Sequence, residues 1–282
     1  MIRCKDFSFQ YKGADRPAIQ HLNLEIAQGD FVGIIGKSGA GKTTLTYALN
    51  GIVPHYFPGD FYGEVNVFGM DTVEVRPEKL SLTVGSVLQD TDAQMVASVV
   101  VDELLFGLEN FGVPKDTIAS RMQEALESVG ISSLRDREIR SLSGGQKQKV
   151  AIAAILALRP QVVVLDEPTG ELDPQSSRQV YQILKELNEA HGITVIAVEQ
   201  KIMQLCEFSK KLLVMDEGRC LFYDTVPKVL AHHQELERIG VNVPRVVTLA
   251  GRLAELGLSP DRIPVNIDEA EQMVRRLIYG HA

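Results

Sequence analysis

The stretch FVGIIGKSGAGKTT, residues 31–44, decides the fold. Its first five residues form an apolar run that predicts a buried strand over Phe31–Ile35, and a periodic helix is expected to begin near Lys42. The glycines between them let the backbone turn tightly, and the start of the helix adds a positive end. A strand, a glycine loop and a helix in this order predict a site for the phosphates of a nucleoside triphosphate. An ordinary glycine turn is the alternative.

Two side chains of this loop have expected chemical roles. Lys42 should reach the β- and γ-phosphates, and Thr43 should present its hydroxyl to Mg²⁺. The glycines leave room for backbone N–H groups to approach the anion. The residues expected to bind ATP here are Gly36, Lys37, Ser38, Gly39, Ala40, Gly41, Lys42, Thr43 and Thr44.

A second segment, VVVLDE at residues 162–167, places two carboxylates after an apolar run. Four apolar residues in succession suit a central parallel strand that is buried on both faces. Asp166 is the expected carboxylate for Mg²⁺, directly or through water, and Glu167 is expected to polarise the attacking water. Taken alone, the segment could also be a strand that ends in solvated acids.

A third segment, LSGGQ at residues 142–146, precedes a helical apolar pattern over Gln148–Leu158. Its serine and glycines would open that helix and point N–H groups and a positive helix end at a phosphate. We expect it to cap a phosphate from outside, since the first loop already cradles one. The simple start of a helix is the alternative.

The order and separation of these motifs resemble the ATP-binding cassette ATPases over residues 1–225. The motifs that carry the resemblance are the phosphate-binding loop, Gln89 after a strand, LSGGQ, LDEP at 165–168 and Leu172-Asp173. The resemblance implies ATP hydrolysis with ATP and Mg²⁺ as cofactors. It also implies two cassettes that face each other head to tail, so that LSGGQ of one closes over the ATP of the other.

The resemblance assigns roles to further residues. Gln89 would serve both the Mg²⁺ site, with Thr43 and Asp166, and the catalytic set, with Glu167. Tyr11 would stack on adenine, although an aromatic residue on an N-terminal strand could equally belong to the core. The residues that would contact the ATP of a partner cassette are Ser143, Gly144, Gly145 and Gln146.

A narrower resemblance, to the ATPase subunits of energy-coupling factor transporters, lies outside the nucleotide motifs. It rests on NGIVPH at 50–55, FGLEN at 106–110, and the residues around Val243, Pro244 and Leu249. It implies an importer of a vitamin or metal ion, with a membrane scaffold subunit and a membrane substrate-binding subunit as partners. It also implies a peripheral place on the cytoplasmic face of the cell membrane.

The same resemblance gives a role to an acidic segment after Gln89. Gln94, Asp102 and Glu103 fall where the family receives the coupling helices of the scaffold. A mixed acidic surface without a partner would have the same sequence. His55 lacks a second ligand at metal spacing, so we expect it to pack or to lie at the surface.

Two positions depart from the cassette pattern. Gln200 follows the apolar strand Thr194–Val198, where the family usually has a histidine that contacts the γ-phosphate. Glutamine can still orient water by hydrogen bonds, but it cannot become a cation near neutral pH. Glu171 stands where a small residue is common. These departures favour a heterodimer, in which a second ATPase with the histidine supplies the faster site.

Composition excludes several classes of protein. The 282 residues have a formal net charge of −8 and offer no basic stripe, which counts against nucleic acid as a partner. No apolar run approaches the ~18 residues that span a bilayer, and the start of the chain lacks the apolar segment of a signal peptide. Three scattered cysteines fit a reducing cytosol.

The pattern of elements predicts an α/β fold of the P-loop NTPase type with a mostly parallel sheet. An N-terminal antiparallel β subdomain is expected over residues 1–11, 18–26 and 63–68. The other expected strands cover residues 31–35, 83–88, 162–166, 194–198 and 212–215. A helical subdomain is expected at about 99–140, within a nucleotide-binding domain of residues 1–225.

Residues 226–282 are expected to form a small C-terminal helical extension. Pro244 would open one amphipathic helix, and Asp268 with Glu271 resembles a capping box for another. Their apolar faces would pack either on their own cassette or on a partner ATPase, which makes dimerisation one possible role.

Three other functions compete with the importer of the energy-coupling type. They are the ATPase of a conventional importer with a separate soluble binding protein, an ATP clamp that works on nucleic acid or ribosomes, and a regulatory cassette that only binds ATP. Glu167 argues against the last. The transported substrate has no signature in this sequence.

Overall fold

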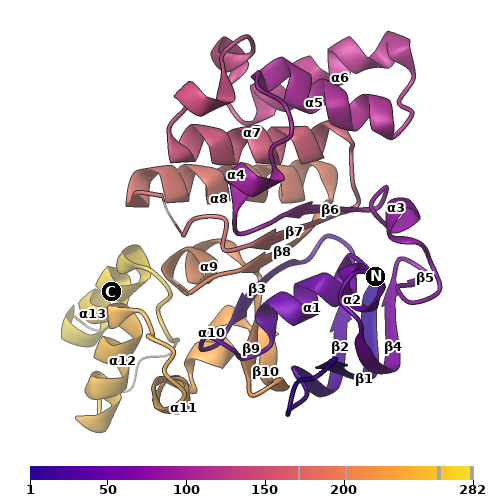
Figure 1. Ribbon diagram of the computed structural model, residues 1–282. Coiled ribbons are helices and arrows are strands. Elements are labelled where there is room, and N and C mark those ends of the chain that lie inside the picture. Colours follow the sequence, from indigo (N-terminus) through magenta and orange to yellow (C-terminus); the bar gives the residue numbers. More distant parts are fainter. Residues whose placement is uncertain (171, 201, 259–261, 280–282) are drawn as a thin grey trace.

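The computed structural model describes residues 1–170, 172–200, 202–258 and 262–279. The expectation for Glu171 therefore lies outside the described residues. Helices cover both faces of a central sheet, and a second sheet lies beside one face (Figure 1). This arrangement confirms the expected α/β fold with a parallel core.

The central sheet has six strands in the order β10-β9-β3-β8-β7-β6. All neighbouring pairs are parallel except β9 and β10. The strands are β3 (Phe31–Ile35), β6 (Val84–Val87), β7 (Val162–Asp166), β8 (Thr194–Val198), β9 (Lys211–Asp216) and β10 (Arg219–Thr225). Three of them have the expected bounds. The strand β10 was not expected, because an edge strand needs no run of apolar residues.

Alternation along β3 connects two hydrophobic clusters on opposite faces of this sheet. Phe31 and Ile35 belong to the cluster on the side of the helical lobe. Val32 and Ile34 belong to the cluster on the side of the second sheet. Because successive side chains of a strand point to opposite faces, this one strand fixes both layers. Its apolar run is explained by burial on both sides.

The second sheet is antiparallel, with the order β2-β1-β4-β5. Its strands are β1 (Ile2–Tyr11), β2 (Ile19–Ile26), β4 (Gly59–Val67) and β5 (Met70–Asp71). This confirms the expected N-terminal β subdomain, but β4 begins four residues earlier than expected. Gly59 pairs with Tyr11, and a Cβ at Gly59 would lie 2.3 Å from the carbonyl oxygen of Gln10. Only glycine permits this close approach.

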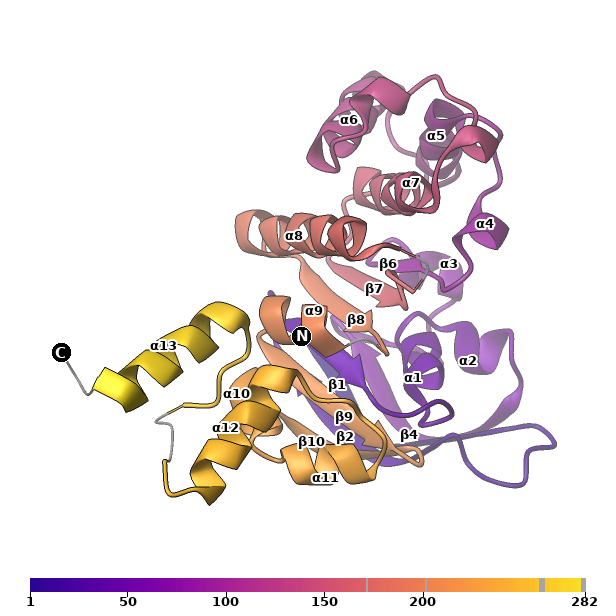
Figure 2. The same cartoon turned by 90° about the vertical axis from the view of Figure 1, so that its left-hand side faces the viewer.

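The helices that precede LSGGQ in the chain are α1 (Lys42–Leu49), α2 (Ile52–His55), α3 (Pro77–Leu80), α4 (Thr91–Gln94), α5 (Val100–Asn110) and α6 (Lys115–Ser128). The helices from LSGGQ onward are α7 (Gly144–Ala157), α8 (Pro174–His191), α9 (Ile202–Phe208), α10 (Val226–Leu230), α11 (His233–Arg238), α12 (Arg245–Glu255) and α13 (Ile267–Tyr279). Turning the molecule shows α5, α6 and α7 as a lobe beyond α8 (Figure 2). This is the expected helical lobe.

The C-terminal residues continue the main core before they leave it. Val226, Val229, Leu230 and Leu236 are buried in the cluster on the helical side. Val247 in α12 is buried there too, so part of the extension packs on its own cassette. In contrast, the apolar residues Leu249, Leu256, Leu258, Ile267 and Ile278 are exposed.

The helix α13 is capped by a different residue from the one expected. The Asn266 Oδ1 atom accepts a hydrogen bond from the Glu269 N–H at 2.9 Å, and the Glu269 carboxylate accepts one from the Val265 N–H at 3.0 Å. The expected cap at Asp268 was therefore two residues too late. Along the described part of the chain, no helix is both long enough and apolar enough to span a bilayer.

Candidate functional site

The glycine loop after β3 presents an uncovered helix start. Gly41 is the N-cap of α1, has a φ of 95° and makes no side-chain cap. The N–H groups of Lys42, Thr43 and Thr44 have no hydrogen-bond acceptor among the described residues. First-turn donors without a partner and the positive helix end together fit an anion. The donor set therefore fits the phosphates that the sequence predicted.

Packing requires glycine at two positions of this loop. A Cβ at Gly36 would lie 2.2 Å from the carbonyl oxygen of Met215, and a Cβ at Gly41 would lie 2.4 Å from that of Ala18. Both residues also have a positive φ, which disfavours other residue types. The loop is thus held against its neighbours with its N–H groups directed away from them.

The Lys42 side chain lies along the inside of the loop. Its Nζ atom donates to the carbonyl oxygens of Gly36 at 2.9 Å and of Lys37 at 3.0 Å. Burial lowers the pKa of the Lys42 ammonium, and the nearby carboxylates of Glu167 and Asp166 oppose that change. A half-desolvated ammonium beside free N–H groups fits an expected role in binding phosphate.

The Lys37 side chain points elsewhere. Its Nζ atom pairs with Asp216 at 2.8 Å and with Glu217 at 3.8 Å, in the turn between β9 and β10. The hydrogen bond with Asp216 raises the pKa of Lys37. Only the backbone of Lys37 therefore faces the loop, through the carbonyl that Lys42 contacts.

The structure brings Thr43 and Asp166 together, as expected for a magnesium site. Asp166 ends β7 and is 4% exposed. Burial raises the pKa of its carboxyl, and a hydrogen bond from the Thr43 side chain opposes the change. A hydroxyl and a carboxylate beside a phosphate-binding loop are ligands that Mg²⁺ accepts. The residues present fit this ion.

The next residue, Glu167, receives two side-chain amides. The Gln200 Nε2 atom donates to one carboxylate oxygen at 2.8 Å, and the Gln89 Nε2 atom donates to the other at 3.3 Å. Glu167 has a φ of 51°, which is uncommon for a residue other than glycine. The three expected catalytic residues therefore lie together, although they follow three different strands.

Tyr11 lies at the edge of the loop. Its hydroxyl is 3.1 Å from the Thr44 Oγ1 atom, and its ring contacts Phe9 edge-on at 4.9 Å between centroids. Phe57 lies on another side of the same ring at 6.4 Å. Tyr11 is partly buried beside the loop.

The LSGGQ residues do not contact the glycine loop within one chain. The Ser143 hydroxyl accepts from the Gln146 N–H at 3.3 Å, and the Gln146 side chain accepts from the Ser143 N–H at 3.0 Å. This capping box begins α7 at Gly144, four residues before the expected helix. In both views α1 and α7 lie on opposite sides of the sheet (Figures 1 and 2). Residues 143–146 form no hydrogen bond or ion pair with residues 36–44 in the described structure.

An ion pair that was not predicted from the sequence joins the start of α7 to the segment after Gln89. The Lys147 Nζ atom lies 2.8 Å from Asp92 and so joins α7 to α4, just after Gln89. A cavity of about 660 Å³ adjoins this pair and is also lined by Gln89, Gly144 and Glu167. Neither Lys147 nor Asp92 belongs to a recognisable motif, so no local pattern predicts that they pair.

Two of the residues that were expected to contact coupling helices form hydrogen bonds within this chain. The Gln94 side chain accepts from the Leu88 N–H and donates to the Ser86 carbonyl. The Glu103 carboxylate accepts from the N–H groups of Val96 and Ala97. These bonds hold the segment after β6 in shape.

His55 lies at the surface, which is one of the two places expected for it. Its Nε2 atom lies 3.0 Å from the carbonyl oxygen of Thr72. Within the described residues, no cluster of three or more histidine, cysteine or acidic side chains could hold a metal ion.

Comparisons with known proteins identify the family of this chain. The family model for ABC transporters matches residues 19–170. A Pyrococcus horikoshii protein, provisionally named an ABC transporter ATP-binding protein, is 38% identical over 98% of this chain and 96% of its own length. A Saccharolobus solfataricus relative with the same kind of name is 36% identical over 86% of this chain, which spans only 46% of that relative.

Solved structures have the same fold. The cbiO1 protein from Clostridium perfringens, described as part of the ABC transporter complex cbiONQ, matches with a TM-score of 0.75 and 30% identity over 88% of this chain and 97% of its own. The cassette MJ0796, solved as a dimer after hydrolysis with ADP and phosphate, matches with a TM-score of 0.70 and 26% identity over 80% of this chain and 99% of its own.

Lys42→Ala should weaken ATP binding. A charged hydrogen bond to phosphate contributes roughly 1.5–3 kcal/mol, so we expect the ATP dissociation constant to rise at least about 10-fold. Calorimetric titration of the purified protein measures it. Lys79→Ala, at an exposed lysine on α3, is the control and should leave the affinity unchanged. Equal affinities for both variants would contradict the site.

Proposed function

The chain belongs to the ABC transporter family, whose cassettes hydrolyse ATP in transport, and we propose that it is the ATPase subunit of an energy-coupling factor importer. Its substrate would be a vitamin or a metal ion. Membrane subunits would carry that substrate, and the cassette would bind to their cytoplasmic side. The similarity in fold to cbiO1, which is part of a transporter complex, supports this narrower assignment.

One observation carries the ATPase part of the proposal. The loop donors and the three catalytic residues converge at one sheet edge, whereas residues 143–146 form no hydrogen bond or ion pair with the glycine loop in the described part of the chain. A second cassette, turned head to tail, would supply the missing donors to the γ-phosphate. The N–H groups of Gly144 and Gly145, which the capping box of α7 does not use, suit that contact.

Within the site, each residue has a proposed role. Lys42 and the N–H groups of the loop bind the phosphates, and Tyr11 stacks on adenine. Thr43, Gln89 and Asp166 hold Mg²⁺, which neutralises developing charge on the phosphate oxygens when bound. Glu167 polarises the attacking water, and Gln200 orients that water by hydrogen bonds.

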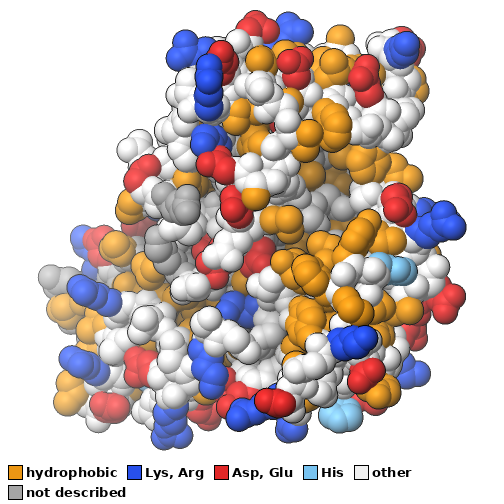
Figure 3. Space-filling model, viewed as in Figure 1, with side chains coloured by type: hydrophobic (Ala, Val, Ile, Leu, Met, Phe, Trp, Pro, Cys, Tyr) orange, Lys and Arg blue, Asp and Glu red, His pale blue; other side chains and the backbone are white. Residues whose placement is uncertain are grey.

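An apolar surface supports a membrane partner. Hydrophobic side chains gather over α1, α2 and α3 and continue toward α5 (Figure 3). Exposed residues on these elements or beside them are Tyr56, Phe57, Leu82, Val96 and Phe106. A large exposed apolar patch usually marks an interaction site. The patch is next to the Gln89 segment, so a partner bound there would sense the state of the site.

Co-purification with membrane subunits tests the transport assignment. The tagged protein should bring down a polytopic scaffold subunit from detergent-solubilised membranes, and Phe106→Asp should reduce the yield several-fold because a charge is costly in an apolar contact. Leu221→Asp, at an exposed apolar position on β10, is the control. ATPase activity stimulated by nucleic acid, without any membrane subunit, would instead support an ATP clamp.

The glutamine at position 200 favours a heterodimer within this proposal. A second ATPase with a histidine at the equivalent position would provide the faster hydrolytic site. The site on this chain would then bind ATP normally and hydrolyse it more slowly. A transporter that is fully active with this chain as its sole ATPase would remove the need for a partner of that kind.

Gln200→His should raise turnover in the assembled transporter. A catalytic hydrogen bond from histidine contributes about 10-fold or more in other enzymes, so we expect a gain of that order in kcat per site on this chain. Phosphate release at saturating ATP measures it. Gln28→His, at an exposed glutamine outside the site, should change nothing. An unchanged kcat for Gln200→His would show that this position does not limit hydrolysis.

The C-terminal helices have a proposed role in dimerisation, with residues 226–282 as an extension of the nucleotide-binding domain. Leu256 and Ile278 are 77% and 66% exposed, which leaves apolar surface for a partner ATPase. Truncation after Thr225 would also remove six buried residues of the main core cluster. Substitution of exposed residues is therefore the sharper test.

The double variant Leu256→Lys and Ile278→Lys should weaken association without loss of folding. Burying a lysine in an apolar interface is costly, whereas exposed substitutions usually change stability by less than about 0.5 kcal/mol. Light scattering during gel filtration measures the mass, and urea unfolding measures stability. Unchanged assembly with unchanged stability would assign these helices to their own cassette alone.

A further inference from the structure

A buried carboxyl group lies beside the proposed catalytic residues without being one of them. Glu199 directly follows β8 and is 2% exposed. Its Oε1 atom accepts three hydrogen bonds: from the Thr169 N–H at 3.1 Å, from the Thr169 hydroxyl at 2.6 Å, and from the Tyr181 hydroxyl at 3.2 Å. The residues of this network come from the loop after β7, the end of β8 and the helix α8.

Those donors offset part of the cost of burying this group. A carboxylate without partners in the interior costs several kcal/mol. Burial raises the pKa of the Glu199 carboxyl, and the bonds from Thr169 and Tyr181 oppose the change because they stabilise the charged form. Glu199 therefore stays in place only while Thr169 and Tyr181 stay in place.

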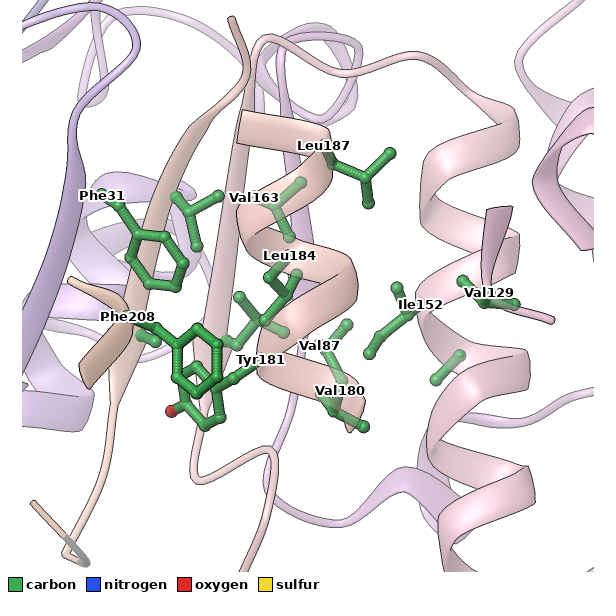
Figure 4. Packing of buried hydrophobic residues seen from close by; sticks show 14 of the residues in the cluster. Phe31, Val87, Val129, Ile152, Val163, Val180, Tyr181, Leu184, Leu187 and Phe208 are labelled. Atoms are coloured by element: carbon green, nitrogen blue, oxygen red, sulfur yellow. The ribbon is translucent and has the colours of Figure 1, made fainter. Parts of the chain in front are cut away.

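The donor Tyr181 is rigidly held. It is fully buried, and its ring is stacked on Phe31 at 6.3 Å and on Phe208 at 5.8 Å between centroids. Figure 4 shows Tyr181 reaching from α8 toward these two rings. A close-packed side chain has few other rotamers, so it gives Glu199 a fixed anchor in the core.

Consecutive side chains after β8 point in opposite directions. The Glu199 N–H donates to the Ile34 carbonyl at 3.2 Å, which continues the pairing of β8 with β3. In extended backbone, neighbouring side chains alternate. Glu199 consequently enters the core, while Gln200 is exposed and reaches the Glu167 carboxylate at 2.8 Å.

Both loops at the site are joined through Glu199. Thr169 lies two residues after Glu167, and Gln200 lies one residue after Glu199. A further bond from the Glu167 N–H to the Val198 carbonyl, at 2.9 Å, holds the two strand ends together. The side-chain network extends this backbone contact by two residues along the loop after β7, from Glu167 to Thr169.

We propose that Glu199 is a positioning residue that locks the loop after β7 to the end of β8 and so fixes the Gln200 amide against the Glu167 carboxylate. Its carboxyl is buried, and it acts through Thr169. The inference rests on the proposed function for the catalytic roles of Glu167 and Gln200. Its geometric part does not depend on that function.

Amide hydrogen exchange in the isolated protein tests the geometric part. Glu199→Ala leaves the Thr169 N–H without an acceptor, so exchange of that amide should speed up about 10-fold or more. Glu199→Gln keeps an acceptor oxygen and should stay near wild type. The control is Asn188→Ala on α8, which removes a buried amide bonded to the carbonyls of Gly29 and Ile193. Equal exchange at Thr169 in the Glu199→Ala and Asn188→Ala variants would overturn the proposal.

Kinetics of the assembled ATPase test the functional part. Glu199→Ala should lower kcat about 10-fold and leave the KM for ATP within about twofold, because the ATP contacts remain. Adding Gln200→Ala should have little further effect, since both changes remove the same contact, whereas Asn188→Ala should combine additively. Additive losses for Glu199→Ala and Gln200→Ala would overturn the proposal. If the wild-type assembly hydrolyses no ATP, the proposed function fails, and the exchange experiment still decides the role of Glu199.

Discussion

The parallel pairing of β3, β8, β7 and β6 is the constraint on which the site depends. In this ladder Ile34 pairs with Val198, Val198 with Asp166, and Leu165 with Val87. Four strands therefore end at one edge of the sheet, and the residues that follow them meet there. The glycine loop, Gln200, Glu167 and Gln89 are distant in sequence, and this register makes them neighbours.

Polar groups at this edge are buried, and each is held by specific partners. Lys42 binds loop carbonyls, Asp166 receives the Thr43 hydroxyl, and Glu199 receives three donors. Such groups would destabilise the core if they were unpaired. The left-handed backbone of Glu167 adds strain at the same place, and strained residues of this kind gather at functional sites. The arrangement of side chains at this edge is therefore maintained at a cost in stability.

The chain has two sets of backbone N–H donors, one in the glycine loop before α1 and one in the first turn of α7. The first turn of α7 lies across the sheet from the glycine loop, and Ser143 is occupied by its own capping box. The ion pair of Lys147 with Asp92 connects α7 to the segment after Gln89, which adjoins the apolar surface.

The sequence by itself determined the motifs, the strands β3, β7 and β8, and the type of fold. Glycine spacing and apolar runs that end in acids are local patterns, and local patterns are enough to specify a strand, a turn and a helix start. The convergence of Gln89 and Gln200 on one carboxylate was decided by tertiary structure, since it depends on the register of strands far apart in the chain. The contacts Lys147–Asp92 and Thr169–Glu199 could not be predicted from the sequence either, because each joins residues that are far apart in the chain. The edge strand β10 and the cap at Asn266 were missed because solvent and neighbouring elements, rather than periodicity, select them.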